Sequence, residues 1–297
     1  MSWRAWMAFG ALGIIWGLPY FFIKLALQDL SPFVVAWGRV ALGTLILLPI
    51  AWQRGALRTL GAHWGAVCGF AVAEFIIPFS AISFGEQWIS SSVTGILIAT
   101  VPLTIALISR FFGLHEPLGI ARLAGLVLGF IGVAALIGLG TVTGSRGWSG
   151  VACMLLATIG YAIGPLIVQR HLSRVDGFGP VAASMLLSAV ALLPFALYNF
   201  PSHLPSAIAL SSVALLGAVC TALAMVLMFF LVSHAGASRA SVITYINPAV
   251  ATLLGVTLLH ERLGIGGILG LALILLGSWL ATRGSARRRA AAGEALV

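Results

Sequence analysis

Glu74 is the residue of this chain whose type and position point most clearly to chemistry. It is the only carboxylate predicted near the middle of a long apolar run, and Pro78 follows one helical turn later. An ionisable group inside such a run is costly unless it is paired or reached by water, so its presence indicates a function. Glu74 could hold the amine of a ligand or carry a coupling proton. It could equally form a structural ion pair with Lys24 or Arg39, and the sequence leaves these alternatives open.

Two cations are expected toward the same end of the apolar runs as Glu74. Lys24 is the only lysine of the chain and lies close to the end of its run, so we interpret its long side chain as reaching toward water. Arg39 lies deeper, about 10 Å from the nearer end at about 1.5 Å per helical residue. At that depth a contact with a carboxylate is expected, either from a bound ligand or from Glu74.

Four aromatic side chains inside the apolar runs are candidates for lining a ligand site: Trp16, Tyr20, Tyr161 and Tyr245. Flat aromatic surfaces suit an aromatic or cationic ligand through stacking and cation–π contacts. Aromatic side chains in such runs also pack against neighbouring helices or lie near the ends of the runs. This alternative stays open for each of the four.

The dipeptide Asn247–Pro248 is a further candidate because proline interrupts a helix. The ring of Pro248 frees the carbonyl of Thr244, four residues earlier. The amide of Asn247 can then serve either the kink or a ligand. We therefore place Asn247 and Tyr245 next after Glu74 as candidate binding residues.

The sequence offers no comparable case for catalysis, metal binding or a cofactor. Its only two aspartates, Asp29 and Asp176, lie 147 positions apart, so the clustered acids that hold a metal or activate a phosphate are not expected. The three cysteines, Cys68, Cys153 and Cys220, have no second ligand nearby and are predicted to be small buried apolar residues. A nucleotide-binding loop of the G-x-x-x-x-G-K type is absent from the sequence. We therefore expect that the protein is not an enzyme and has no cofactor and no metal.

The composition places these residues in lipid. Hydrophobic residues make up 61% of the 297 positions and charged residues 8%, with a mean hydropathy of +1.11. This leaves too little polar surface to cover a soluble protein. The net charge of +9 could suggest nucleic acid, but the positive residues are spread singly between apolar runs rather than gathered on one face. We therefore expect membrane lipids as partners, and no nucleic acid.

Ten apolar runs are long enough to cross a bilayer as helices, since about 20 residues span the hydrocarbon core. They lack the alternation of a membrane β-barrel and are rich in Leu, Ala and Gly. We therefore predict an all-α membrane protein with ten transmembrane helices. The runs cover approximately residues 5–28, 32–52, 62–84, 88–110, 118–139, 148–170, 178–198, 208–233, 238–258 and 264–282.

The chain is a duplication with an offset of 145 residues. The string Leu-His-Glu at residues 114–116 returns at residues 259–261, and the same offset pairs Trp16 with Tyr161. Five runs fall in each copy, and an odd number makes the second copy enter the bilayer in the opposite direction. Symmetry would then bring Trp16 and Tyr161 to opposite walls of one central cavity. The predicted units are two inverted five-helix repeats at residues 1–140 and 146–282 and a basic tail at 283–297.

The distribution of Lys and Arg orients the ten runs. Arg39 lies within a run, while Lys24, Arg146 and Arg262 fall on one side. The remaining twelve fall on the opposite side together with both termini, and the positive-inside rule places that side in the cytoplasm. These twelve are Arg4, Arg54, Arg58, Arg110, Arg122, Arg170, Arg174, Arg239, Arg283, Arg287, Arg288 and Arg289.

Taken together, these features resemble the drug/metabolite transporter superfamily, EamA type, over roughly residues 5–282. The residues that carry the resemblance are Trp16–Gly17 in the first run, Pro102 and Pro248 in the fourth and ninth, and Glu116 and Glu261 at the hairpins that follow. Within the superfamily the chain is similar to bacterial inner-membrane exporters of amino acids, in particular the aromatic amino acid exporter.

The resemblance implies a central cavity lined by the first, third, fourth, sixth, eighth and ninth helices and used for alternating access. Glu116 and Glu261 carry over as structural groups at helix ends rather than as catalytic groups. Two departures make the copies unequal at the expected site. Tyr161 stands where the first copy has a Trp, and Gly164 stands opposite Pro19.

We therefore expect an inner-membrane carrier that exports small metabolites, of which amino acids, including aromatic ones, fit best. A carrier of cationic drugs or nucleotide-like metabolites is the alternative in the same class. An unpaired Glu74 would favour the cations, and a dominant Arg39 would favour carboxylates or phosphates. A multi-pass membrane enzyme or sensor is the alternative from another class, and it would need converging catalytic groups or a reporter domain. Because two fused halves can build one site, we expect a monomer.

Overall fold

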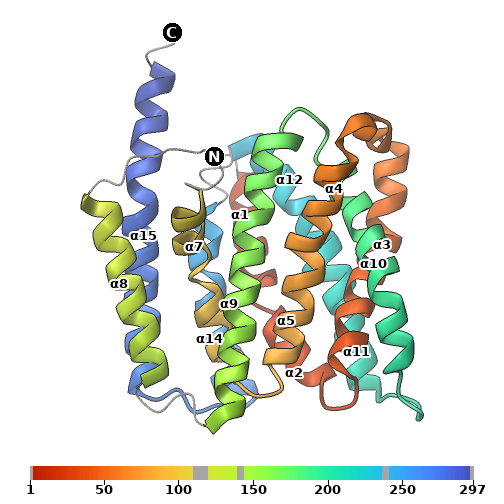
Figure 1. Cartoon of the computed structure of the whole chain (residues 1–297), viewed down its shortest axis with the longest axis horizontal. Helices are drawn as coiled ribbons and strands as arrows, with labels where there is room; N and C mark the ends of the chain where they lie inside the picture. Colours follow the sequence, from red (N-terminus) through yellow and green to blue (C-terminus); the bar gives the residue numbers. More distant parts are fainter. Residues whose placement is uncertain (1–2, 110–119, 139–143, 236–240, 295–297) are drawn as a thin grey trace.

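The bundle is helical throughout the part of the chain that the computed structural model describes, which is residues 3–109, 120–138, 144–235 and 241–294. No strand occurs in these ranges. The helices run between two ends of one bundle, and α1 begins near the end at which α15 finishes (Figure 1). The prediction of an all-α protein is confirmed.

The order of the elements follows the ten predicted runs. The first half of the chain contains α1 (Trp3–Ile15), α2 (Pro19–Ala26), α3 (Pro32–Gln53), η1 (Ala56–His63), α4 (Trp64–Phe70), η2 (Ala71–Ile76), α5 (Ile77–Gly85), α6 (Ser91–Ile98), α7 (Val101–Ile108) and α8 (Ile120–Leu136). The second half contains α9 (Gly144–Ile167), η4 (Val168–Leu172), α10 (Phe178–Tyr198), α11 (Ala207–Gly217), η5 (Ala218–Leu223), α12 (Ala224–Ala235), η6 (Ser241–Tyr245), α14 (Asn247–Leu258) and α15 (Ile265–Glu294).

Seven helical segments of the described residues are long and apolar enough to cross a membrane. Three shorter apolar helices accompany them, at Leu123–Leu136, Ile243–Leu258 and Ile265–Ala281. The seven segments are Trp3–Ala26, Pro32–Gln53, Ala56–Gly85, Ser91–Ile108, Gly144–Leu172, Phe178–Tyr198 and Ala207–His234. The protein is therefore built for several membrane crossings, while the number ten stays a prediction.

Prolines set the breaks within several of these segments. Pro19, Pro102 and Pro248 each stand in the first turn of a helix, namely α2, α7 and α14. Proline has no N–H to donate and its ring clashes with the carbonyl four residues earlier, so the preceding helix ends there. Pro78 follows the π-helical turn η2 in the same way. The pairs α1–α2, α6–α7 and η6–α14 are consequently interrupted helices rather than straight ones.

Helices α8 and α15 pack against each other through glycines. A Cβ atom on Gly125 would lie 2.6 Å from the carbonyl oxygen of Gly277, and one on Gly270 would lie 2.9 Å from the carbonyl oxygen of Gly132. The partner number falls as the residue number rises, so the two helices are antiparallel. Gly125 and Gly270 are 145 residues apart, as are Gly132 and Gly277. The contact is therefore reciprocal, joining equivalent positions of the two sequence copies.

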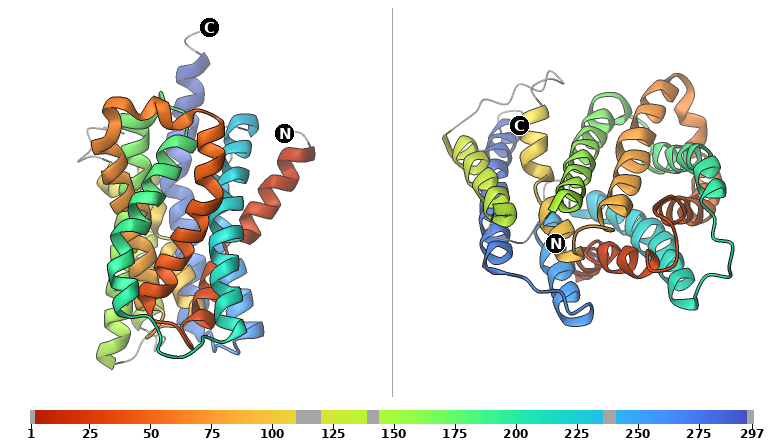
Figure 2. Two further views of the ribbon diagram at one scale, coloured as in Figure 1. Left: turned by 90° about the vertical axis from the view of Figure 1, so that its right-hand side faces the viewer. Right: turned by 60° about the horizontal axis from the view of Figure 1, so that its bottom comes forward.

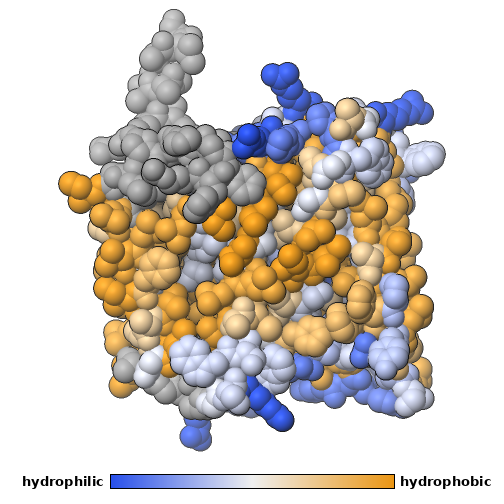
Figure 3. All heavy atoms as spheres, viewed as in Figure 1, coloured by the Kyte–Doolittle hydropathy of each residue, from blue (hydrophilic) through white to orange (hydrophobic). Residues whose placement is uncertain are grey.

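The end of the bundle opposite the termini is called the distal face here. It is formed by the loops at residues 27–31, 86–90, 199–206 and 259–264 (Figures 1 and 2). Between the two ends the surface in Figure 3 is largely apolar, whereas hydrophilic side chains gather toward both ends. This distribution is the one expected of a protein whose middle contacts lipid.

Candidate functional site

Arg39 lies in the interior of the bundle on α3, with only 6% of its surface exposed. Its Nε donates a hydrogen bond of 2.9 Å to the hydroxyl of Thr221, in the π-helical turn η5. Its guanidinium carbon lies 3.7 Å from the centre of the Phe79 ring, a cation–π contact. Within the described ranges no carboxylate lies at ion-pair distance from Arg39. The guanidinium is therefore held in place without being neutralised.

Glu74 lies across the bundle core in the π-helical turn η2, against a glycine of α9. The carboxylate oxygen Oε2 is enclosed and has no hydrogen-bond partner among the residues that the structure describes. A Cβ atom on Gly164 would lie 2.1 Å from this oxygen, so only a glycine leaves room for the carboxylate there. Gly160, one turn earlier, lets α9 approach the carbonyl of Ala73 in the same way. The absence of a side chain on α9 thus creates the place that Glu74 occupies.

The alternative of a structural ion pair for Glu74 is not found in the described part of the chain. Arg39 binds Thr221 and Phe79 instead. The ammonium of Lys24 donates to the backbone carbonyl of Glu86 and, at 2.8 Å, to that of Ile89. These carbonyls follow the last turn of α5 and lack partners within the helix, which explains their attraction for a cation. Lys24 is only partly exposed, and its ammonium ends at these carbonyls of the distal loop, so the interpretation that it reaches toward water stays a prediction.

Tyr161 joins Arg39 and Glu74 into one polar group. This tyrosine, on α9, lies within electrostatic range of both the guanidinium of Arg39 and the carboxylate of Glu74. Tyr20, on α2, lies within range of Tyr161 and Arg39 and is 6% exposed. The structure thus brings together four of the seven predicted site residues, drawn from α2, α3, η2 and α9.

The other three predicted residues lie at helix breaks. Trp16 stands between α1 and α2 and packs on a separate apolar cluster that includes Leu12 and Ile243. Tyr245 ends η6. With its amide nitrogen turned toward the neighbouring carbonyls, Asn247 donates to the oxygens of Ile243 and Gly13, both at 3.1 Å. These bonds tie the kink before α14 to α1, so Asn247 serves the kink.

Glu261 caps a helix from far along the chain. Its carboxylate accepts hydrogen bonds from the backbone N–H of Ser91 (2.7 Å), and from the N–H (2.9 Å) and hydroxyl (2.6 Å) of Ser92. These groups form the N-terminus of α6, where the helix dipole also favours a negative charge. The role at a helix end that the resemblance implied for Glu261 agrees with this geometry, whereas Glu116 lies outside the described residues.

Glu86 is a buried acid that reasoning from the sequence missed. It follows the last residue of α5 and is 0% exposed. Residue 86 falls between the predicted apolar runs 62–84 and 88–110, so the sequence analysis did not single it out. The sequence did offer one signal. Lys24 lies near the same end of the bundle, and its ammonium needs hydrogen-bond acceptors close by.

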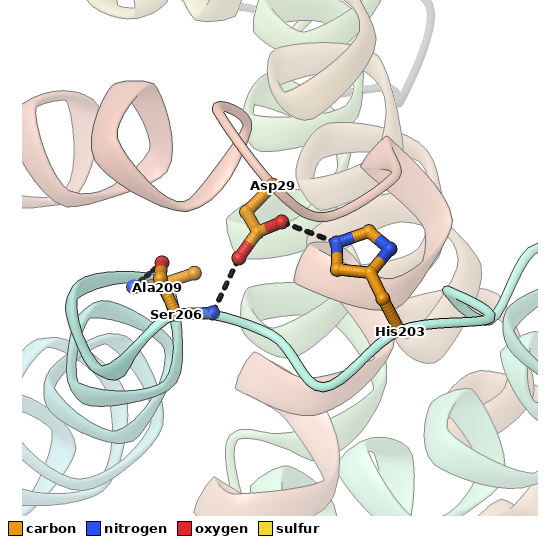
Figure 4. Close-up of polar contacts among 4 residues, drawn as sticks. All are labelled: Asp29, His203, Ser206 and Ala209. Atoms are coloured by element: carbon orange, nitrogen blue, oxygen red, sulfur yellow. Dashed lines mark hydrogen bonds and ion pairs between the residues drawn. The ribbon is translucent and has the colours of Figure 1, made fainter.

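A polar cluster on the distal face ties two loops together (Figure 4). The carboxylate of Asp29 lies 2.6 Å from Nε2 of His203 and accepts a hydrogen bond from the backbone N–H of Ser206. Ser206 in turn caps α11 by accepting from the N–H of Ala209. The hydrogen bonds from His203 and Ser206 lower the pKa of Asp29 to about 2. This cluster fastens the loop at 27–31 to the start of α11.

Comparison with known proteins gives one family for both halves of the chain. A sequence profile described as the EamA-like transporter family matches residues 3–138 and again residues 148–283. A solved structure described only as a crystal structure of a protein superposes with a TM-score of 0.68 over 97% of this chain and 99% of its own. At 21% identity it shows a shared fold alone.

Several relatives have names that say what kind of protein they are. The chain is 26% identical over 280 residues to the uncharacterized transporter YoaV of Bacillus subtilis, covering 93% of this chain and 96% of that protein. It is 28% identical over 281 residues to the uncharacterized inner membrane transporter YedA of Escherichia coli K12, covering 92% and 89%. It is 27% identical over 278 residues to a chloroplastic WAT1-related protein of Arabidopsis thaliana, covering 89% and 66%.

Proposed function

The chain belongs to the EamA-like transporter family, and from this premise we propose that it exports amino acids, including aromatic ones, by alternating access. Membrane transport follows from the family and from the relatives, whose names describe them as transporters. The identity of the substrate, in contrast, has to be argued from the residues of the site. The same proposal places the protein in the inner membrane with ten spans and both termini in the cytoplasm.

The observation that carries the substrate proposal is a buried guanidinium and a carboxylate with an enclosed oxygen, both within electrostatic range of one tyrosine. Neither Arg39 nor Glu74 has an ionic partner within the described ranges, and both lie within electrostatic range of Tyr161. Uncompensated charges in the interior are costly, so each favours a ligand that brings the opposite charge. An amino acid brings both, because its carboxylate suits the fork of Arg39 and its ammonium suits Glu74.

The aromatic side chains around these charges favour an aromatic or other apolar substrate. Tyr20 and Tyr161 are neighbours at the site, and Phe79 already stacks under Arg39. Such faces hold an aromatic ring by offset or edge contacts. We assign Trp16, Tyr245 and Asn247 a supporting role at the helix breaks, where a change of access would alter the backbone.

Alternating access requires two halves that can rock against each other. The reciprocal glycine contact between α8 and α15 supports inverted repeats at residues 1–140 and 146–282, with the tail at 283–297 outside them. Because both copies lie in one chain, a monomer embedded in membrane lipids contains the whole site. When the site is empty, Glu74 is also the candidate for carrying a coupling proton.

The proposal is tested with the purified full chain in liposomes that contain unlabelled phenylalanine, by measuring exchange uptake of labelled phenylalanine. We expect phenylalanine to compete, and its analogues lacking the carboxylate or the amine to compete poorly. Glu74→Gln should impair exchange more than it lowers thermal stability, because Gln keeps the shape and loses the charge. Unchanged uptake by Glu74→Gln would remove Glu74 from the mechanism.

The competition pattern also separates the alternative substrates. If the amine alone competes as well as phenylalanine, the carrier recognises cations through Glu74. If carboxylates or phosphates alone compete, Arg39 dominates recognition. Either result would contradict the amino acid proposal while leaving membrane transport intact.

A further inference from the structure

The end of α5 carries a second buried carboxylate, that of Glu86, which the proposed substrate site does not use. The residue is 0% exposed, and neither carboxylate oxygen has a hydrogen-bond partner among the residues described. A carboxylate ion buried without donors is strongly disfavoured, whereas the neutral acid is tolerated. The geometry therefore points to a proton on Glu86 in the arrangement seen.

Lys24 is near Glu86 but is engaged elsewhere. Its ammonium donates to the backbone carbonyls of Glu86 and Ile89, and no ion pair with the Glu86 carboxylate is formed in the described part of the structure. These two bonds fasten α2 to the segment between α5 and α6 at the distal face. The one lysine of the chain thus holds a closed loop rather than neutralising its acidic neighbour.

The negative charge of the nearby Glu261 carboxylate opposes a second negative charge on Glu86. The Glu261 carboxylate lies within electrostatic range of Glu86 and takes three hydrogen bonds from Ser91 and Ser92 at the N-terminus of α6. Those donors stabilise the charge on Glu261. Two acids within electrostatic range of each other do not both ionise readily, so the buried acid without donors is the one that carries the proton.

The remaining titratable groups around Glu86 do not supply a partner. Tyr20 and Arg39 lie within electrostatic range, but Arg39 is committed to Thr221 and Phe79. Cys153 lies beside Gly85 on the facing helix α9. Together with Lys24 and Glu261, these are the titratable or charged groups that, among the residues described, face Glu86 from α2, α3, α9 and the loop at 259–264.

We propose that Glu86 is a proton-binding site that is occupied while the distal face is closed and empties when that face opens. On opening, water reaches the acid, the proton passes to water on the distal side, and Lys24 leaves the two carbonyls to pair with the new carboxylate. On closing, one proton is taken from the same side. Acid on the distal side therefore favours the closed arrangement, and alkali favours the open one.

The proton itself is tested by infrared spectroscopy of the purified full chain in lipid. We expect the carbonyl absorption of protonated carboxylic acids at neutral pH to contain a component that is lost in Glu86→Gln and retained in Glu74→Gln, the matched control. This absorption should decline as the pH of wild-type protein is raised, a measurement that needs no variant. A wild-type titration without such a decline, or a spectrum that Glu86→Gln leaves unchanged, would overturn the proposal.

The link to opening is tested with a cysteine reporter beneath the distal face. Val93 of α6 is 1% exposed, so Val93→Cys, with the three native cysteines replaced, should react with a water-soluble maleimide on the distal side only when this face opens. Because the thiolate is the reactive form and its fraction rises with pH, each rate is divided by that of Gln28→Cys, an exposed position on the distal face. We expect this ratio to rise with distal pH, and to become small and independent of pH when Glu86→Gln is added. A pH dependence that survives in Glu86→Gln would contradict the link. This result does not depend on which substrate the protein carries.

Discussion

Glu261 and Ser92, 169 residues apart, share two hydrogen bonds: one carboxylate oxygen accepts from both the N–H and the hydroxyl of Ser92, at 2.9 Å and 2.6 Å. The acid belongs to the loop before α15, and the serine begins α6. The contact therefore joins the two halves of the chain at the distal face. Under the proposed alternating access, we expect this contact to break when the distal face opens.

Glu261→Ala should destabilise the protein by removing this cap. Hydrogen bonds to a charged group contribute about 1.5–3 kcal/mol each, and losing the acid leaves the first N–H groups of α6 without partners. We expect a lower apparent melting temperature in detergent. Arg262→Ala, at the exposed neighbouring position, is the control and should have little effect. Equal melting temperatures for the two variants would show that the cap does not hold the distal face.

Gly164→Ala should weaken substrate binding with little loss of stability. The new Cβ would lie 2.1 Å from Oε2 of Glu74, so the carboxylate must move, but it is the flexible end of a side chain. We expect affinity in the exchange assay to fall by about tenfold, or about 1.4 kcal/mol. Gly10→Ala is the matched control, because nothing lies within 4 Å of its Cβ position. A loss of transport that is the same in both variants would remove the steric explanation.

Arg39→Lys should impair recognition of the substrate carboxylate although it keeps the positive charge. Lysine cannot offer the planar fork, and it gives up both the Nε bond to Thr221 and the stacking on Phe79. We expect a loss of about 1.5–3 kcal/mol in substrate affinity, measured as a rise in the half-saturating concentration of exchange. Thr221→Val removes the positioning bond alone and should have a smaller effect of the same sign. Wild-type affinity in Arg39→Lys would exclude a bidentate contact.

The distal cluster of Asp29 should make stability fall in acid. The pKa of Asp29 is lowered from 3.8 to about 2 by the bonds from His203 and Ser206, so its contribution is complete above 3.8 and is lost as the pH falls toward about 2. We expect the melting temperature of wild-type protein to drop across this window more steeply than that of Asp29→Asn. Parallel curves for the two proteins would show that the bonds to Asp29 do not stabilise the fold.

Local sequence chemistry was sufficient to predict the helices and some of their breaks. Long apolar runs specify helices, and a proline stands in the first turn of α2, α7 and α14, where the preceding helix ends. Pro49, Pro165 and Pro194 instead lie inside α3, α9 and α10, so a proline alone does not locate a break. The grouping of Tyr20, Arg39, Glu74 and Tyr161 was anticipated in part, because polar groups inside apolar helices gather where they are not exposed to lipid.

What the sequence left undetermined depends on contacts between distant segments. Lys24 was expected to reach water, and only the packing of α2 against the end of α5 reveals the two carbonyls there that take its ammonium. Glu86 lies one residue beyond the end of α5, and a sequence predicts the end of a helix only to within a few residues. Its burial therefore depends on the loops that cover it. Asn247 could serve a kink or a ligand until the carbonyl of Gly13, on another helix, was seen beside it.

The proposed function requires that the two halves of the chain cross the membrane in opposite directions around one site. Gln28 and Ser173 occupy equivalent positions, 145 residues apart, and both are exposed, at loops on opposite ends of the bundle. In whole cells carrying Cys68→Ser, a membrane-impermeant maleimide should label Gln28→Cys at once, and Ser173→Cys only after the membrane is permeabilised. Labelling of both cysteines from the same side would contradict the inverted arrangement and the carrier mechanism built on it.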